Sequence, residues 1–374
     1  MSILFLKGND MKTLLVGDLS PTVDTSPLFA KGEVDALFGD VRTLFEGNDV
    51  NLINLECALT NHEEGIKKFG PCIKTPPESA KTLKALGVTH ACLSNNHFFD
   101  FGKKGALDSL AALDSVGIAY TGFGENEQDA KRDLIIEKDG ERIALICVCE
   151  HEYSYALPDR MGARAFDEFE TMLEIAEAKK HADRVIVTYH GGKEQCEYPS
   201  PRLMKACRAM AAHGADVILC QHSHCIGCYE EYMGCHILYG QGNFHFVFTE
   251  NDREMDNWHH SLAVRYDTKS HKIEFIPLTQ GKGPDMRLAK GEDAARIMGG
   301  FEKRNAELAN GEWRRGWHEF CMTKAEHYTR SVARAYIPEA PERHNHCFAH
   351  YLDCEAHLDV YRELFQTANQ TNEK

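Results

Sequence analysis

The stretch 216–244 constrains this chain more than any other, because it places two histidines directly after a short apolar run. Residues 217–220 read Val-Ile-Leu-Cys, a β-branched-rich run that predicts a buried strand. His222 and His224 follow, with Ser223 between them. Alternate residues of extended backbone share a face roughly 6.5–7 Å apart, so two imidazoles there can each hold one of two neighbouring metal ions. A chain with twenty histidines also produces this spacing by chance, and the motif alone does not separate the two interpretations.

Length and charge narrow the class of protein. A chain of 374 residues exceeds the usual size of one core, which favours a large α/β domain with an appendage, or two domains. The net charge of −15 argues against nucleic acid or an anionic membrane surface as partner, because long-range repulsion opposes both. A small anionic or phosphorylated substrate is compatible with this net charge, because a nearby pair of metal ions attracts an anion more strongly than distant surface charges repel it.

The cysteines and the N-terminus indicate where the protein works. Fourteen cysteines are scattered along the chain, several inside apolar runs where a thiol acts as a small hydrophobe, so we expect reduced thiols. The N-terminal apolar run 3–6 is too short for a signal peptide or a membrane span. We therefore expect a soluble cytoplasmic protein with no membrane partner, and a homo-oligomer is compatible with the sequence.

Strand patterns alternate with helical patterns through the first 280 residues. Helices are predicted at 34–46, 78–86, 103–116, 166–181 and 202–213. A hairpin over 134–147 turns on Asp139-Gly140 and suits a two-sheet sandwich. From Gly291 onward the pattern is helical and charged, with Trp313 and Trp317 as buried anchors. This order predicts an α/β fold with a C-terminal helical extension, and such folds place ligands at the carboxyl ends of strands.

Polar residues of ligand type follow five of the predicted strands. They are Asp18, Glu56, the pair Asn96-His97, His190, and the pair His222/His224. Carboxylate oxygens, an amide oxygen and neutral imidazoles suit two divalent ions, and a shared carboxylate can bridge them. One such residue is weak evidence, whereas five in the same structural position predict a metal centre.

These residues lie in motifs that resemble a known family. The motifs are Gly17-Asp18, Asn54-Leu-Glu56, Asn95-Asn96-His97, His190-Gly-Gly-Lys-Glu194, His222-Ser-His224 and Tyr239-Gly-Gln-Gly-Asn243-Phe. They are similar to those of CapA-type poly-γ-glutamate capsule synthesis proteins, a branch of the calcineurin-like metallophosphoesterases, from about residue 12 to 278. The resemblance implies a four-layer α/β/β/α sandwich, which we place at residues 1–283, and the helical pattern that follows predicts an extension over 284–374 that packs on it.

The resemblance also implies roles for individual residues. It places Asp18 and His224 on one metal. It places Glu56 as a bridge to a second metal, which three further residues hold: Asn96, His190 and His222. His97 would face the substrate, binding a phosphoryl oxygen or protonating the leaving group, and Glu194 would lie near the pocket. The cofactor is then one or two divalent ions from Mn, Fe, Zn and Mg.

Two departures from the family pattern bear on metal occupancy. Many phosphoesterases carry Asp-x-His at the first strand, but Ser20 stands here at the third position, so the first metal loses an imidazole. Gln221 replaces the usual glycine before His-x-His and narrows that loop. A single filled site is one outcome that this sequence allows.

Two further clusters contain residues that can bind metal ions, but we expect both to be packed in the protein interior instead. Cys225 and Cys228 form a Cys-x-x-Cys without two more ligands at workable spacing. The second cluster has a/d spacing, which would put its side chains on one helix face that packs against the domain: Cys347, His350, Cys354 and His357.

Three functions fit the sequence. The first is a metal-dependent hydrolase in which metal-bound hydroxide attacks a phosphate ester or related bond. The second is a non-catalytic or accessory role in poly-γ-glutamate (capsule) synthesis, which the family implies, although this acidic chain shows no anchor and would repel the polymer. The third is a structural protein with remnant ligands, which Ser20 supports.

Overall fold

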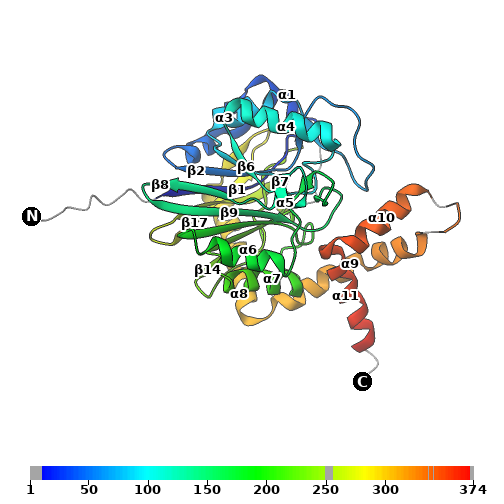
Figure 1. The fold of residues 1–374 in the computed structure, drawn as a ribbon. Helices are drawn as coiled ribbons and strands as arrows, with labels where there is room; N and C mark the ends of the chain where they lie inside the picture. Colours follow the sequence, from blue (N-terminus) through cyan, green and yellow to red (C-terminus); the bar gives the residue numbers. More distant parts are fainter. Residues whose placement is uncertain (1–10, 249–255, 336, 340, 371–374) are drawn as a thin grey trace, which may run out of the picture.

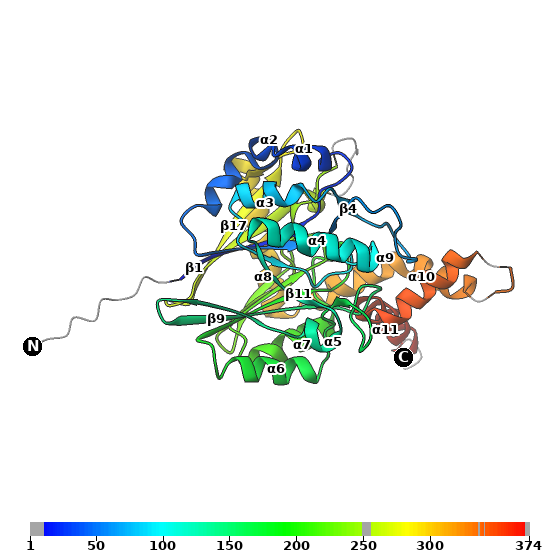
Figure 2. The same cartoon turned by 45° about the horizontal axis from the view of Figure 1, so that its top comes forward.

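Two mixed β-sheets pack face to face, and helices cover both outer faces (Figure 1, Figure 2). The structure is a computed structural model that describes residues 11–248, 256–335, 337–339 and 341–370. None of the helices in these described ranges is long and apolar enough to cross a membrane.

The first sheet runs in the order β18-β17-β16-β1-β2-β5-β6, and β15 also pairs with β1. Its strands β1, β2, β5 and β6 are parallel, while β16, β17 and β18 are antiparallel neighbours. Their bounds are β1 Lys12–Leu19, β2 Val50–Leu55, β5 His90–Cys92, β6 Ala119–Thr121, β15 Asn243–His245, β16 His260–Asp267, β17 Lys272–Gln280 and β18 Met286–Leu288.

The second sheet runs in the order β13-β14-β12-β11-β9-β8. Its central strands are parallel, and antiparallel strands form both edges. The hairpin predicted at Asp139-Gly140 joins β8 to β9. The bounds are β8 Leu134–Lys138, β9 Glu141–Cys149, β11 Arg184–His190, β12 Val217–Gln221, β13 Tyr229–Tyr232 and β14 Cys235–Leu238.

Alternation of side chains along the strands builds three apolar layers. Leu14 and Val16 of β1 pack under the helices on the first sheet, while Leu15 faces the second sheet. In β12, Leu219 faces the first sheet and Ile218 faces the outer helices of the second. Because successive residues point to opposite faces, strands buried on both sides read as continuous apolar runs. The predicted four-layer α/β/β/α sandwich with a C-terminal helical extension is confirmed.

Helices and short strands complete the layers. The first sheet is covered by α1 Ser26–Lys31, α2 Val34–Phe38, the 3-10 helix η1 Gly39–Phe45, α3 Ser79–Leu86 and α4 Gly102–Val116. The second is covered by α6 Glu170–Ala178 and α7 Pro201–Ala212. The remaining short elements are β3 Ala58–Leu59, β4 Lys74–Thr75, β7 Phe123–Gly124, α5 Glu127–Ala130, β10 Gly162–Ala163 and η2 Asp256–His259.

Two helices differ from their predicted bounds. The segment 34–46 is not one helix: α2 ends at Phe38 because Gly39 takes a φ of 44°, and the chain continues as a 3-10 helix. The segment 166–181 is helical only over α6, since the Asp167 carboxylate accepts hydrogen bonds from the amides of Phe169 and Glu170 and so delays the first helical turn.

The C-terminal extension consists of four helices: α8 Gly291–Asn310, α9 Trp313–Arg334, α10 Glu342–Asp353 and α11 Glu355–Gln370. α8 packs against β13 of the second sheet and β17 of the first, and α9–α11 lie at one end of the sandwich (Figure 1). Trp317 is fully buried as predicted, whereas Trp313 is only half-buried. The predicted single helix through Cys347 and His357 is wrong, because Cys354 takes extended backbone and separates α10 from α11. The division at residue 283 stays a prediction, and β18 continues the first sheet beyond it.

Candidate metal centre

The carboxyl ends of β1, β2, β5, β11 and β12 meet at one edge of the sandwich. Strand register places Asp18 beside Asn54, and it aligns the ends of β11 and β12 through His190 and Gln221. The six residues for which metal binding was predicted lie together there, each between 0 and 8% exposed: Asp18, Glu56, Asn96, His190, His222 and His224. Their convergence follows from the parallel strands, and their role as ligands stays a prediction.

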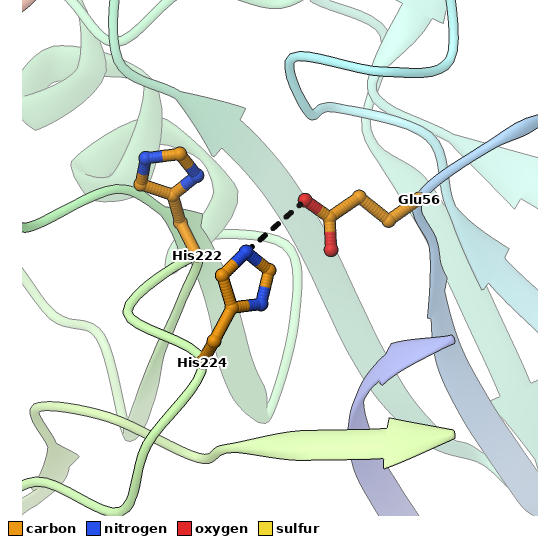
Figure 3. Close-up of side chains that lie close together, drawn as sticks. All are labelled: Glu56, His222 and His224. Atoms are coloured by element: carbon orange, nitrogen blue, oxygen red, sulfur yellow. Dashed lines mark ion pairs between the residues drawn. The ribbon is translucent and has the colours of Figure 1, made fainter. Parts of the chain in front are cut away.

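Glu56 joins two groups of ligand atoms. The ligand atoms of Asp18, Glu56 and His190 lie within 4.8 Å of one another, and so do those of Glu56, His222 and His224. Figure 3 shows the Glu56 carboxylate extended toward the two histidines of the β12 loop. One carboxylate shared by two groups is the geometry that a bridged pair of cations requires.

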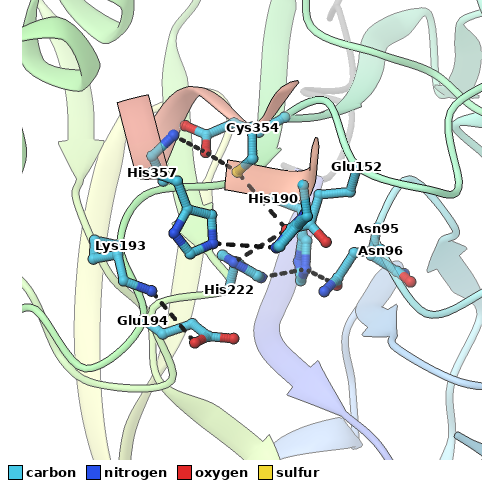
Figure 4. A network of polar contacts seen from close by, with 12 residues as sticks. Asn95, Asn96, Glu152, His190, Lys193, Glu194, His222, Cys354 and His357 are labelled. Atoms are coloured by element: carbon cyan, nitrogen blue, oxygen red, sulfur yellow. Dashed lines mark hydrogen bonds and ion pairs between the residues drawn. The ribbon is translucent and has the colours of Figure 1, made fainter. Parts of the chain in front are cut away.

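Hydrogen bonds orient the His190 ring. Its Nδ1 lies 2.9 Å from the amide nitrogen of Asn54, whose side chain also donates to Asp18 Oδ1 at 2.7 Å. Its Nε2 lies 3.0 Å from Asn96 Oδ1 and 3.2 Å from His222 Nδ1 (Figure 4). His190 Nε2, the side-chain oxygen of Asn96 and His222 Nδ1 therefore lie next to one another.

The two histidines of the β12 loop are held in unusual backbone. His222 has a φ of 74° and His224 a φ of 54°, in the left-handed region that costs free energy for residues other than glycine. The amide of His222 donates to Asp18 Oδ2 at 3.0 Å, and His224 Nδ1 lies 2.8 Å from Asn243 Oδ1. These contacts tie the loop to β1 and to the start of β15, so both rings point inward.

The donor set fits divalent cations. Both carboxylate oxygens of Glu56 are buried and form no hydrogen bond in the described structure, and the ion-pair contacts of Oε1 with His190 Nε2 at 3.4 Å and His224 Nε2 at 3.9 Å are long ones. Asp18 and Glu56 are carboxylates and the three histidines can act as neutral ligands, which is the set that Mn, Fe and Zn accept. A cation between these atoms would satisfy Glu56.

The pKa values of His224 and Asp18 in the protein without cations indicate that the buried carboxylates stabilise positive charge in this pocket. Burial lowers the pKa of His224, but Glu56 and Asp18 outweigh it and raise that pKa to about 10. Burial raises the pKa of Asp18, yet the hydrogen bond with His224 and the charge of His190 bring it down to about 2. Protons on the imidazoles thus offset the carboxylates, a role that cations would take over.

The two departures from the family pattern are both buried near the centre. Ser20 follows β1, donates its amide to the carbonyl of His245 at 2.8 Å, and its hydroxyl has no hydrogen-bond partner in the described structure. Gln221 ends β12 and its amide nitrogen lies 3.3 Å from Gln241 Oε1. The group formed by Asp18, Glu56 and His190 holds one imidazole, and the group formed by Glu56, His222 and His224 holds two.

His97 belongs to a hydrogen-bonded triad beside the centre. His97 Nδ1 lies 2.7 Å from Asp100 Oδ2, and Lys68 Nζ donates to the other oxygen of Asp100 at 2.5 Å. The Lys68 and Asp100 side chains are 3% and 0% exposed. Sequence reasoning missed both residues. Asp100 is three residues beyond His97 and could have been sought there, whereas Lys68 lies in a loop without any local signal.

Two more positioning groups were missed. Asn54 precedes Glu56 by two residues, so alternation along β2 already puts them on one face. Glu152 lies in the loop after β9, with Oε1 3.6 Å from His222 Nε2, and burial raises its pKa to about 8. A carboxyl group beside the second nitrogen of a metal-binding histidine orients that ring.

A cavity of about 350 Å³ opens beside the centre. Asn96, His97, Glu152 and Glu194 line one part of it. Glu194 was predicted near the pocket; it lines the cavity and belongs to neither group of ligand atoms in the described chain, and the Lys193 charge holds its pKa below the usual range. The other wall comes from α9, α10 and α11, which the sequence did not connect with the site.

The clusters around Cys225 and around Cys354, which the sequence suggested as possible metal sites, are explained by packing and ion pairs. Cys225 and Cys228 are buried, and in the described part of the chain they belong to no group of three close metal-ligand side chains. Cys354 does lie close to Glu150 and Glu355. Glu150 there accepts hydrogen bonds from Arg202 and the amide of Ala356, so the cluster is satisfied as an ion-pair network.

Solved structures align with most of the chain at low identity. A hypothetical protein from Thermus thermophilus covers 72% of this chain and 100% of its own, with 14% identity and a TM-score of 0.44. The 5'-nucleotidase from Candida albicans SC5314 covers 73% of this chain and 52% of its own, with 8% identity and a TM-score of 0.39. Neither alignment bears on what this protein does.

Sequence relatives are more informative. PGA biosynthesis protein CapA of Bacillus subtilis (strain 168) is 30% identical over 272 residues, 70% of each chain. Capsule biosynthesis protein CapA of Bacillus anthracis is 26% identical over 297 residues, 76% of this chain and 71% of the relative. Residues 12–248 match the family described as bacterial capsule synthesis protein PGA_cap, so the chain belongs to that family.

Proposed function

We propose that this protein is a metal-dependent hydrolase that cleaves a phosphate ester or related bond in a small anionic substrate. The observation that carries the proposal is Glu56, a fully buried carboxylate that forms no hydrogen bond in the described structure, has only long ion-pair contacts with His190 and His224, and lies in both groups of ligand atoms. A buried charge of this kind is stable only when paired or bound to cations. One or two divalent ions, of Mn, Fe, Zn or Mg, would occupy this position.

Bound metal ions would activate the attacking water, and a residue of the protein would transfer the proton. Two cations at these ligands would supply a Lewis acid and lower the pKa of a bound water toward neutrality. His97 is the group of this chain that would handle a proton. Asp100 accepts from Nδ1 of its ring at 2.7 Å, and when the ring carries a second proton on Nε2, this N–H can donate to a phosphoryl oxygen or pass its proton to the leaving oxygen in the adjoining cavity.

The test separates metal binding from proton transfer. Protein purified without chelator, then reconstituted with Mn²⁺, is expected to hold one or two equivalents of metal and to hydrolyse bis(p-nitrophenyl) phosphate or p-nitrophenyl phosphate. Glu56→Gln keeps the shape but removes the charge, so it should lose bound metal and turnover together. His97→Asn should keep its metal and lower kcat by about 10²–10⁴-fold. Metal content is measured by elemental analysis and kcat from released nitrophenolate.

His213→Ala is the matched control, since His213 is exposed at the end of α7 and belongs to no ligand group in the described chain. It should retain both metal and turnover. Protein that stays metal-free after reconstitution and hydrolyses neither ester would contradict the proposal. Turnover unchanged in His97→Asn would remove His97 from its role.

The named relatives support a second candidate. Two are called CapA proteins of PGA or capsule biosynthesis, and a third, 29% identical over 208 residues, is a probable polyglutamine synthesis accessory protein of Mycobacterium tuberculosis. An accessory role in poly-γ-glutamate synthesis would show as binding of that polymer by metal-loaded protein that turns over neither ester. Calorimetry with the purified polymer measures it.

A further inference from the structure

The wall of the 350 Å³ cavity opposite the metal centre is built from the C-terminal helices. Lys324 and Tyr328 come from α9, His350 and Tyr351 from α10, and His357 from α11. Figure 4 shows His357 grouped with Lys193 and Glu194 next to His222. A small-molecule site of this size is therefore completed by residues that lie far along the chain from the last predicted metal ligand.

Lys193 is a buried cation of this cavity, and its ion-pair partner in the described structure is Glu194. Its side chain is 8% exposed, and its ion pair with Glu194, whose own side chain is 47% exposed, is a long contact of 3.4 Å. The turn that carries it is fixed beside the metal centre, because the amide of Gln195 donates to the carbonyl of Ser223 at 2.7 Å. A buried ammonium group has three N–H donors, and a single carboxylate partner leaves donors that a bound anion can accept from.

Two more lysines line the same cavity. Lys68 is buried and held by Asp100, so it is partly neutralised, while Lys324 lies over the ring of Phe320 at 5.2 Å. The acidic residues that line the cavity are Glu152 and Glu194, so lysines outnumber carboxyl groups along its wall. With Lys68 matched by Asp100, two lysines and two carboxyl groups remain along the wall, so the cavity is close to neutral in a protein whose net charge is −15.

A chain of hydrogen bonds ends in an unused imidazole nitrogen. Tyr328 Oη lies 2.5 Å from His357 Nδ1, and His357 Nε2 lies 3.1 Å from His350 Nε2. Burial lowers the pKa of His350 to about 4, so this ring is neutral at pH 7. If Tyr328 donates to His357 and His357 donates to His350, then His350 Nδ1 carries the proton, and this atom has no hydrogen-bond partner in the described structure.

We propose that Lys193, Lys324 and His350 form an anion-binding subsite that holds a second negatively charged group of the substrate, such as a carboxylate, while the metal centre holds the group that reacts. The subsite rests on the proposed hydrolase function. It defines the substrate class as small molecules with two anionic groups, one of them a phosphate ester. It also gives the C-terminal helices a role in substrate selection rather than in the chemical step.

The test compares two phosphonates that differ in one charge. Calorimetry of Mn²⁺-loaded full-length protein measures Kd for 3-phosphonopropionate and for n-propylphosphonate, which carries a methyl group in place of the carboxylate. The subsite predicts that 3-phosphonopropionate binds at least tenfold more tightly. Lys193→Met and Lys324→Met should each reduce this ratio at least threefold. Lys303→Met, an exposed lysine of α8 outside the cavity, should leave the ratio unchanged.

Each outcome decides a different point. Equal affinities for the two phosphonates would overturn the subsite and leave the proposed hydrolase function standing. A preference that survives in both lysine variants would overturn the assignment of these residues. No binding of either phosphonate to metal-loaded protein would overturn the subsite together with the proposed function. Lys324 is half-buried on the surface of α9, so Lys324→Met still tests the subsite if Lys193→Met does not fold.

Discussion

Backbone strain marks the residues that matter at this site. His222 and His224 both have positive φ, which costs about 1 kcal/mol or more for each residue with a side chain. The strain is sustained because the amide of His222 donates to Asp18 and the ring of His224 is held by Asn243. These two contacts aim the imidazoles at Glu56, a direction that a relaxed strand end would not take.

A histidine outside the metal centre should control stability in acid. His245 is fully buried between the rings of Phe29 and Phe38, and burial lowers its pKa to about 4. The unfolded chain binds a proton near pH 6.5 while the folded chain does not, so stability is present above pH 6.5 and falls as the pH drops toward 4. The loss from this residue should be on the order of 3 kcal/mol by pH 4.

His245→Gln keeps a side-chain N–H near the carbonyl of Pro284, which His245 Nε2 contacts at 3.0 Å, but cannot titrate. Urea unfolding between pH 4 and 7 should therefore show a shallower loss of stability in this variant than in the natural protein. His213→Gln, an exposed change, should follow the natural pH dependence. Identical slopes for all three proteins would exclude His245 as a source of acid sensitivity.

At the scale of elements, the site depends on the close approach of β1 and the turn before β15. A Cβ atom at Gly17 would lie 2.2 Å from the carbonyl oxygen of Gly242, which is backbone and cannot move aside cheaply. Gly242 itself has a φ of 78°, so the turn has little freedom to adjust. Only glycine at position 17 lets β15 pair beside Asp18 through Asn243.

Gly17→Ala should consequently destabilise the protein by about 2 kcal/mol or more and weaken metal binding, because it displaces Asn243 and the ring of His224 that it contacts. Gly299→Ala is the control, because it makes the same glycine-to-alanine substitution at an open position. This glycine lies within α8 with open space around its Cβ position, so alanine should stabilise by about 1 kcal/mol. Thermal unfolding and metal titration measure both effects. Equal stability of the two variants would contradict the tight packing of β1 on this turn.

At the scale of the whole molecule, buried ion pairs attach the C-terminal helices to the second sheet. Arg202 of α7 donates to Glu150 at 2.5 Å and to Asp359 of α11 at 2.9 Å. Ser200 also donates to Asp359 at 2.6 Å, and the amide of Ala356 donates to Glu150 at 3.0 Å. The extension is therefore joined to the strands that carry the metal centre, and the cavity wall cannot shift without breaking this network.

Arg202→Met should destabilise the protein by about 3–5 kcal/mol, because it removes the cation that pairs with buried Glu150 and leaves buried Asp359 with the exposed Arg362. Hydrogen exchange should show the larger effect in α11, where the amides lose protection. Arg362→Met removes a contact of 3.3 Å with the same Asp359 from a side chain that is 58% exposed, and it should cost less than about 1 kcal/mol. Exchange in α11 that is unchanged by Arg202→Met would show that other contacts attach the extension.

Much of the fold is visible in local sequence. Apolar runs of four to eight residues that end in polar side chains predict the central strands, and glycines such as Gly87 and Gly117 correctly end helices in left-handed backbone. The ordered motifs from Asp18 to His224 predict which strand ends carry the site. Each of these features spans about ten residues or fewer, so each can be recognised without knowing the rest of the molecule.

What the sequence patterns determined was therefore the alternation of strands and helices, the strand ends and the set of chemical groups they carry, while the four-layer sandwich followed from the resemblance of these motifs to a known family. Tertiary packing decided which nitrogen of His190 faces Asn96, where Lys68 and Lys193 lie, and that helices from the C-terminus form a wall of the cavity. It also decided the break at Cys354, which brings His350 and His357 into contact from two helices. The reason is physical: periodicity and turn chemistry act between neighbours along the chain, whereas these contacts join groups that only the completed packing brings together.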